Sequence, residues 1–215
     1  MKNELRYTLL TDGPSDEALL PLLTWLLRQK NIQQPIQSEW ADLRRLPNPP
    51  KKLSQRIEKT LDLYPCELLF IHRDAEKIPF EDRKKEIENA IKKMPNKGKV
   101  PPSVCVIPVR MQEAWLLFDE NAIRKASGNP HGQNTLRLPR LVQLEQLSNP
   151  KDVLHNLIRE ASGLNAHRQK KLNLGVITRR VAEFVIDYSP LRNLSAFSDL
   201  ENEIGQVVNS QGWNV

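Results

Sequence analysis

Residues 67–76, with the sequence ELLFIHRDAE, combine a short apolar run with two acids at its carboxyl end. The four consecutive apolar residues at 68–71 are too few for a helix and are typical of a strand that is buried on both faces. Asp74 and Glu76 follow in a D-x-E pattern, and side chains at i and i+2 of an extended segment point the same way. Two carboxylates aimed at one point repel each other unless a cation or a proton lies between them. The stretch therefore predicts a central strand that ends at an ion-binding site.

The composition of the 215-residue chain is typical of a globular protein with one large or two small domains, since 39% of its residues are hydrophobic and 27% are charged. No apolar run approaches the roughly 20 residues needed to cross a bilayer, so we expect no membrane association. Residues 1–5 lead directly into a strand pattern and do not form the apolar segment of a signal peptide. Cys66 and Cys105 lie in or beside apolar strand-like runs, which predicts buried, reduced thiols. We therefore expect a cytoplasmic protein.

The formal net charge is +6, and the positive residues occur in clusters. Clusters of this kind suit a polyanion such as nucleic acid. For any single cluster, however, a solvated helix face is the simpler explanation, and only clusters gathered on one side of the fold would favour nucleic acid. The clusters lie at residues 44–45, 51–52, 83–85, 92–93, 97–99, 168–171 and 179–180.

Strand and helix patterns alternate in the first half of the chain. We predict strands at residues 5–11, 35–43, 68–71 and 104–109, helices at 15–30, 51–63 and 80–94, and a basic turn at 96–99. Ser15 is expected to cap the first helix, and Pro108 indicates a bulge or an edge near the end of the last strand. The order indicates a parallel α/β sheet with right-handed crossovers.

The pattern becomes helical after residue 109. Helices are expected at residues 112–118, 120–126, 152–161, 175–188 and 195–209, with a turn-rich loop at 127–133. There is no internal repeat and no low-complexity tract. We therefore predict a Rossmann-like α/β core at residues 1–120, with a mostly parallel four-stranded sheet flanked by helices. Residues 121–215 are predicted to form a helical extension that packs on this core.

Acids follow three of the predicted strands. Asp12 comes after the first strand, with Asp16 one helical turn farther on, while Asp74 and Glu76 follow the third strand and Glu113 the fourth. In open parallel sheets ligands bind beyond the carboxyl ends of the strands. Carboxylates that converge there from separate segments would make a site for a hard cation such as Mg²⁺ or Mn²⁺. A metal at that site would polarise a phosphoryl oxygen while basic clusters hold the phosphates.

Each of these residues also has a simpler explanation. Asp12 beside a glycine is typical of a turn, and Asp16 suits the first turn of a helix. Glu76 has a cation on either side to pair with, and Glu113 fits an ordinary helix. His72, inside the strand, is better explained as a packed or hydrogen-bonded residue than as a metal ligand. The shared position of the acids at strand ends is what favours a function.

Two short motifs resemble the Toprim domain of topoisomerases, primases and the overcoming-lysogenization-defect nucleases: TDGPSDE at residues 11–17 and IHRDAE at 71–76. The Toprim pattern is an acid–glycine turn after the first strand and Asp-x-Asp after a later strand. The chain is most similar to a Toprim-related bacterial family of unknown function. That family's E-A-W-L-L-x-D segment is matched by EAWLLFD at 113–119, and residues 189–197 resemble its C-terminal segment.

The resemblance implies a Toprim core and a metal-dependent nuclease, or a related phosphodiester-cleaving enzyme, that acts on DNA or RNA. It also implies a role in phage defence, with an ATPase or another defence protein as partner. The expected metal ligands are Asp12, Asp16, Asp74 and Glu76, and the expected catalytic residues are Asp12, Glu113, Arg73 and Arg110. Both arginines follow predicted strands, where they would steady the charge of a phosphate.

Two acids depart from the family's pattern, because Asp12 replaces the usual Glu and Glu76 replaces the usual Asp. If Asp12 is the general base, its shorter side chain misplaces the proton transfer. The second hypothesis is therefore a catalytically inactive Toprim-like module that binds a protein partner or nucleic acid. A response-regulator receiver also has acids after its first and third strands. It fits poorly, since Asp12 is followed by Gly13 and no lysine ends a fifth strand.

Overall fold

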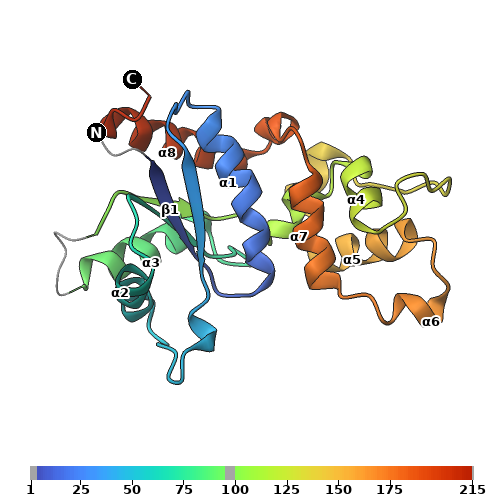
Figure 1. Cartoon of the computed structure of the whole chain (residues 1–215), viewed down its shortest axis with the longest axis horizontal. Helices are drawn as coiled ribbons and strands as arrows, with labels where there is room; N and C mark the ends of the chain where they lie inside the picture. The colour runs from blue at the N-terminus through green and yellow to red at the C-terminus, as the bar shows by residue number, and fades with distance from the viewer. Residues whose placement is uncertain (1–3, 95–99, 215) are drawn as a thin grey trace.

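The computed structural model describes residues 4–94 and 100–214, which form a parallel sheet with helices on both faces and a helical lobe beside it (Figure 1). The strands are β1 (Leu5–Leu10), β2 (Ile36–Ala41), β3 (Leu68–His72) and β4 (Ser103–Val106). Their order is β2-β1-β3-β4, and all three neighbouring pairs are parallel. The predicted α/β class, with a four-stranded parallel sheet and a helical lobe, is confirmed. The basic turn predicted at 96–99 lies outside the described residues.

Strand β3 is the most deeply buried strand, and all five of its residues are buried. It lies between β1 and β4, so Phe70 is opposite Leu9 on one side and Val104 on the other. The Phe70 ring meets the ring of Tyr7 edge to face, with centroids 5.2 Å apart. The continuous apolar run is therefore required by burial on both faces of the sheet.

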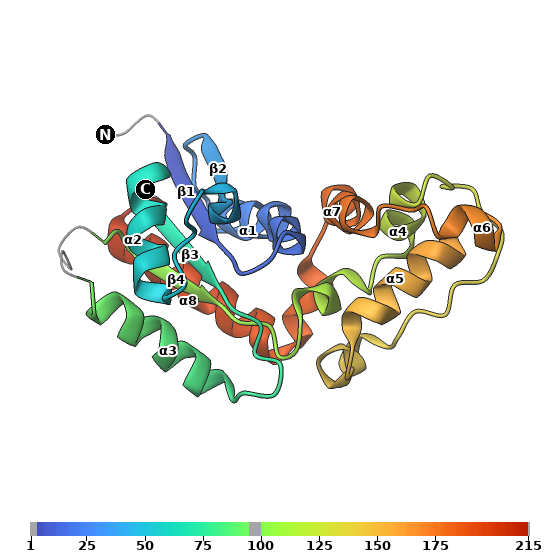
Figure 2. The same cartoon turned by 90° about the horizontal axis from the view of Figure 1, so that it is seen from below.

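Two helices cover each face of the sheet. Helices α1 (Leu19–Arg28) and α8 (Ser195–Gln211) share one apolar core with Tyr7 and Phe70. Helices α2 (Leu53–Leu63) and α3 (Phe80–Lys92) pack on the opposite face, where they lie side by side (Figure 2). Because α8 returns from the helical lobe to pack against β4, the last helix of the chain belongs to the layered core.

The helical lobe contains α4 (Glu120–Ala126), α5 (Pro150–Ala161), α6 (Ala166–Gln169) and α7 (Leu174–Phe184). Each of these helices begins after an Asp or Asn whose side chain accepts a backbone N–H, the preferred chemistry of a helix N-cap. The buried aliphatic residues of α4, α5 and α7 belong to the same core as those of α1 and α8, so the lobe is continuous with one face of the sheet. No helix in the described part of the chain is long and apolar enough to cross a membrane.

Short 3₁₀ segments make the turns between these elements: η1 (Ser15–Ala18), η2 (Leu43–Arg45), η4 (Gln112–Leu116), η5 (Leu141–Gln146) and η6 (Ser189–Asn193). The prediction that Ser15 caps a helix is wrong, because Ser15 lies inside η1 and its hydroxyl donates to the Asp16 side chain instead. Strand β4 ends two residues before Pro108 and forms an edge of the sheet. Cys66 and Cys105 are both free thiols.

We expect Phe70→Ala to destabilise the fold by about 3–5 kcal/mol, because the substitution leaves a cavity where β3 meets the core. Urea unfolding monitored by circular dichroism measures this free energy. Phe184, which is 40% exposed, provides the control, and Phe184→Ala should change the free energy of unfolding by less than about 0.5 kcal/mol. Equal effects of the two substitutions would contradict the central position of β3.

Candidate functional site

The candidate site lies where the strand order reverses. The chain passes from β1 to β2 on one side and then to β3 on the other, so the loops that follow β1 and β3 diverge at the carboxyl edge of the sheet. Such a reversal leaves a crevice in which ligands of open α/β sheets bind. The loop after β1 carries Asp12 and Asp16, and the loop after β3 carries Arg73 and Asp74.

A buried histidine joins these two loops. His72 Nε2 lies 3.4 Å from Asp74 Oδ1 and 3.8 Å from Asp16 Oδ2, while Nδ1 lies 2.9 Å from the Val106 carbonyl oxygen. The Asp16 carboxylate also accepts the Gly13 N–H at 2.8 Å. The histidine is thus hydrogen-bonded within the fold, as expected from its place in the strand, but it also contacts two of the predicted metal ligands.

The environment of His72 favours its charged form. Burial opposes protonation, but the Asp74 and Asp16 carboxylates outweigh it and raise the pKa of His72 to about 9. The geometry explains the direction, because one ring nitrogen faces a carbonyl oxygen and the other faces carboxylates. Only the imidazolium can donate on both sides. The positive charge lies between Asp16 and Asp74 and reduces their mutual repulsion.

Glu113 is the third predicted acid at this edge of the sheet, and it lies in η4, which follows β4. It is 2% exposed, and burial raises the pKa of its carboxyl group, with a further contribution from the charges of Asp74 and Asp16. Lys151 opposes this shift, with its Nζ 3.7 Å from Glu113 Oε1. The neighbouring Gln112 N–H donates to Asp74 Oδ1 at 3.2 Å. Asp16 and Asp74 therefore both contact His72, and Glu113 lies near enough for their charges to raise the pKa of its carboxyl group.

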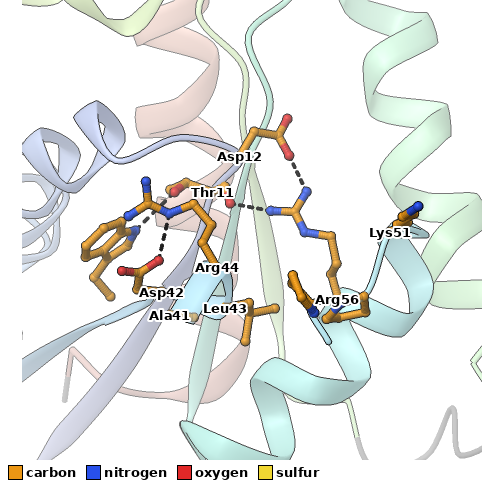
Figure 3. Close-up of a pocket in the computed structure, with 11 residues that line it drawn as sticks. Thr11, Asp12, Ala41, Asp42, Leu43, Arg44, Lys51 and Arg56 are labelled. Carbon is orange, nitrogen blue, oxygen red and sulfur yellow. Dashed lines mark hydrogen bonds and ion pairs between the residues drawn. The ribbon is translucent and has the colours of Figure 1, made fainter. Parts of the chain in front are cut away.

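Asp12 is held apart from this group by two arginines. Its carboxylate accepts a hydrogen bond from Arg56, which also donates to the Thr11 carbonyl oxygen (Figure 3). The other Asp12 oxygen lies 2.9 Å from Arg73 Nε, and Arg73 in turn pairs with Glu86 at 3.2 Å. The predicted metal ligand and the predicted phosphate-binding arginine are therefore partners of each other.

Glu76 and Arg110 form a separate turn. Glu76 has φ +54° and its N–H donates to the Arg110 carbonyl oxygen at 3.2 Å, while Arg110 Nη1 donates to the Glu76 carbonyl oxygen at 3.0 Å. Since β3 ends at His72 and the backbone turns at Glu76, the extended D-x-E geometry expected for Asp74 and Glu76 is not present. Glu76 instead lines an open pocket of about 480 Å³ with Arg110 and Ile78.

The donor chemistry of the acid group fits a hard divalent cation, because Asp16, Asp74 and Glu113 offer only carboxylate oxygens. Within residues 4–94 and 100–214, however, no group of three or more His, Cys, Asp or Glu side chains is arranged to hold a metal ion. His72, rather than a third acid, lies between Asp16 and Asp74. Asp12 and Glu76 are not part of this group.

Arg56 and Gln112 also contact these acids, although neither was predicted from the sequence. Arg56 follows Leu53 by three residues and precedes Thr60 by four, so it lies at the border of the stripe that α2 buries. A cation at the border of a buried helix stripe could have indicated a site residue, because its long side chain can extend past the helix to the carboxyl edge of the sheet. Gln112 contributes its backbone N–H to Asp74 and its side-chain amide to the Ser15 carbonyl oxygen at 3.4 Å.

Comparisons of the chain with models of known protein families, with curated proteins and with solved structures found no match. The function of this edge of the sheet must therefore be inferred from its own residues. The resemblance of residues 11–17 and 71–76 to Toprim motifs stays a prediction.

The contacts of His72 predict a pH-dependent stability. Its pKa is raised from 6.5 to about 9, so its stabilising contribution is complete below pH 6.5 and is lost as the pH rises through about 9. Over this interval the free energy of unfolding of the wild type should fall by up to about 1.4 kcal/mol per pH unit. Urea unfolding between pH 6 and 9.5 should show no such fall for His72→Gln.

His131, which is exposed, supplies the control, since His131→Gln should keep the pH dependence of the wild type. Parallel curves for the wild type and His72→Gln would show that His72 gains no proton on folding. NMR titration of the His72 ring would report its pKa directly.

Proposed function

We propose that the protein is a divalent-metal-dependent enzyme that cleaves phosphodiester bonds in nucleic acid. The observation that carries the proposal is the convergence of Asp16, Asp74 and Glu113 from three separate segments at the switch point of the sheet. Like charges brought together in a partly buried place are costly; His72 offsets part of this cost between Asp16 and Asp74, and a divalent cation would offset the rest. The Toprim resemblance supports the same reaction class, and with it the setting in phage defence beside a partner ATPase.

Asp16, Asp74 and Glu113 would hold Mg²⁺ or Mn²⁺, which when bound polarises a phosphoryl oxygen and lowers the pKa of a coordinated water. His72 would keep Asp16 and Asp74 in position through its contacts with both. Burial raises the pKa of the Glu113 carboxyl group, and a bound cation would favour its ionised form. Arg73, at the same edge, would bind a non-bridging phosphate oxygen.

A second candidate function is a non-catalytic module that binds nucleic acid or a protein partner. It is favoured by the ion pairs of Asp12, because a carboxylate paired with both Arg56 and Arg73 is not free to bind a metal. It is also favoured by the lack of a three-ligand arrangement within the described ranges 4–94 and 100–214. The two candidates differ in one measurable property, because only the enzyme needs to take up a divalent cation.

Asp74→Asn should lower metal-dependent cleavage of DNA or RNA by at least about 100-fold, because it removes the charge of a ligand, and even indirect disturbance of metal ligands costs about 10–100-fold. The assay follows end-labelled single- and double-stranded substrates with Mg²⁺, with Mn²⁺ and with EDTA. Calorimetry on the same proteins measures the uptake of either ion.

Asp62→Asn is the matched control, since Asp62 is an exposed acid on α2 and its loss should leave cleavage unchanged. Equal cleavage by the wild type and Asp74→Asn would remove this group of acids from consideration. A wild type that neither cleaves nor takes up metal would favour the non-catalytic module.

A further inference from the structure

A second pocket lies beyond the carboxyl ends of β1 and β2, next to the candidate site. It has a volume of about 180 Å³ and is lined by the loop after β1, the end of β2, η2, residues 49–51 and the first turn of α2. Three of these side chains are cationic: Arg44, Lys51 and Arg56 (Figure 3). Two of the basic clusters noted in the sequence, at 44–45 and 51–52, therefore contribute to one concave surface.

Arg44 is held in place by its neighbours. Its guanidinium group lies over the Trp40 ring, 5.3 Å from the ring centroid, and its Nε lies 2.7 Å from Asp42 Oδ1. Trp40 is fixed in turn by a hydrogen bond of 3.0 Å from Nε1 to Thr11 Oγ1. Within the described residues, the two terminal nitrogens of Arg44 make no hydrogen bond. An arginine fixed in this way keeps donors for a ligand at a low entropic cost.

The acids of the pocket already have partners. Asp12 is paired with Arg56 and Arg73. Asp42 is paired with Arg44 and lies 3.0 Å from Arg45 Nε. No hydrogen bond or ion pair joins Lys51 to another residue in the described ranges 4–94 and 100–214. The pocket therefore presents positive charge that the protein's own acids do not use.

We propose that this pocket binds a terminal phosphate group of a nucleic-acid strand and so places the strand end beside the acid group. A volume of about 180 Å³ is below the roughly 300–1,000 Å³ of pockets that enclose whole small molecules, so it suits one compact group. A terminal phosphomonoester carries nearly two negative charges at neutral pH, whereas an internal phosphodiester carries one. Lys51 and the terminal nitrogens of Arg44 suit the more highly charged group, and Arg56 would join them on exchanging Asp12 for the phosphate.

Arg56 connects this pocket to the candidate site, because it lines the pocket and also binds Asp12. A phosphate bound there would compete with Asp12 for Arg56. The proposal rests on the proposed function in that it names the part of the substrate that this edge of the sheet would recognise. It concerns binding alone, so it can be tested in the absence of a divalent cation.

The test measures fluorescence anisotropy of labelled single-stranded oligonucleotides in EDTA, with a 5′-phosphate, a 3′-phosphate or only hydroxyl ends. The wild type should bind one phosphorylated form about tenfold more tightly than the hydroxyl form, and excess inorganic phosphate should remove the difference. Lys51→Gln and Arg44→Gln should abolish this preference. Lys52→Gln removes the same charge from the adjacent residue, which does not line the pocket, and should retain the preference.

Equal affinity of the wild type for all three oligonucleotides would overturn the proposal, as would equal loss of preference in Lys51→Gln and Lys52→Gln. Its failure is separable from that of the proposed function. Asp74→Asn should keep the preference for a phosphorylated end even where it abolishes cleavage. If the wild type shows the preference but does not cleave, the phosphate-binding proposal stands and the proposed nuclease activity is rejected.

Discussion

The edge of the sheet depends on how the protein accommodates a charged histidine at the end of a strand that is buried on both faces. Burial of a cation is unfavourable unless it is paired and hydrogen-bonded. His72 meets both conditions, because Asp16 and Asp74 lie near Nε2 and the Val106 carbonyl lies near Nδ1. These contacts connect the turn after β1, the end of β3 and the end of β4. One buried side chain therefore fixes three segments at the point where the strand order reverses.

The ion pairs around Asp12, at the same edge of the sheet, differ from the contacts of His72 because solvent reaches them. The two carboxylates in these ion pairs are exposed, at 45% for Asp12 and 38% for Glu86, and ion pairs that solvent screens contribute a median of about 0–1 kcal/mol to stability. The ion pairs link Arg56, Asp12, Arg73 and Glu86 in series. Their main effect is therefore to position these side chains, and their contribution to the free energy of unfolding is small. These ion pairs keep the guanidinium groups of Arg56 and Arg73 at the carboxyl edge of the sheet.

The fold was largely predictable from the sequence, since strands and helices are set by local patterns. The apolar run 68–71 identified β3, and the alternation of strands and helices identified the parallel sheet. The site was predictable only in part. Asp16, Asp74 and Glu113 come together because all three follow strands at the same edge, and that follows from topology.

The features of the site that local sequence patterns did not predict depend on the path of the backbone after each strand. A left-handed residue at Glu76 turns the chain and breaks the alternation of an extended segment. Ser15 lies inside a 3₁₀ turn and does not cap a helix as predicted, and within the same turn the Asp16 carboxylate accepts the Gly13 N–H. The reach of Arg56 to Asp12 depends on how α2 is rotated against the sheet. Local patterns carry no information about such rotations.

The two charge groups at this edge are adjacent but opposite in sign. The acids around His72 are partly buried, and Glu113 has a carboxyl pKa raised by that burial, so this group gains most from added positive charge. The pocket lined by Arg44, Lys51 and Arg56 is small and open to solvent, so it gains most from added negative charge. Asp12 links the two, because the arginines that neutralise it come from both sides, Arg56 from the pocket and Arg73 from the loop after β3. A ligand with charge of a single sign would neutralise only one of these two groups. A phosphate together with its divalent counter-ion would neutralise both, which is why we favour phosphoryl chemistry over simple anion binding.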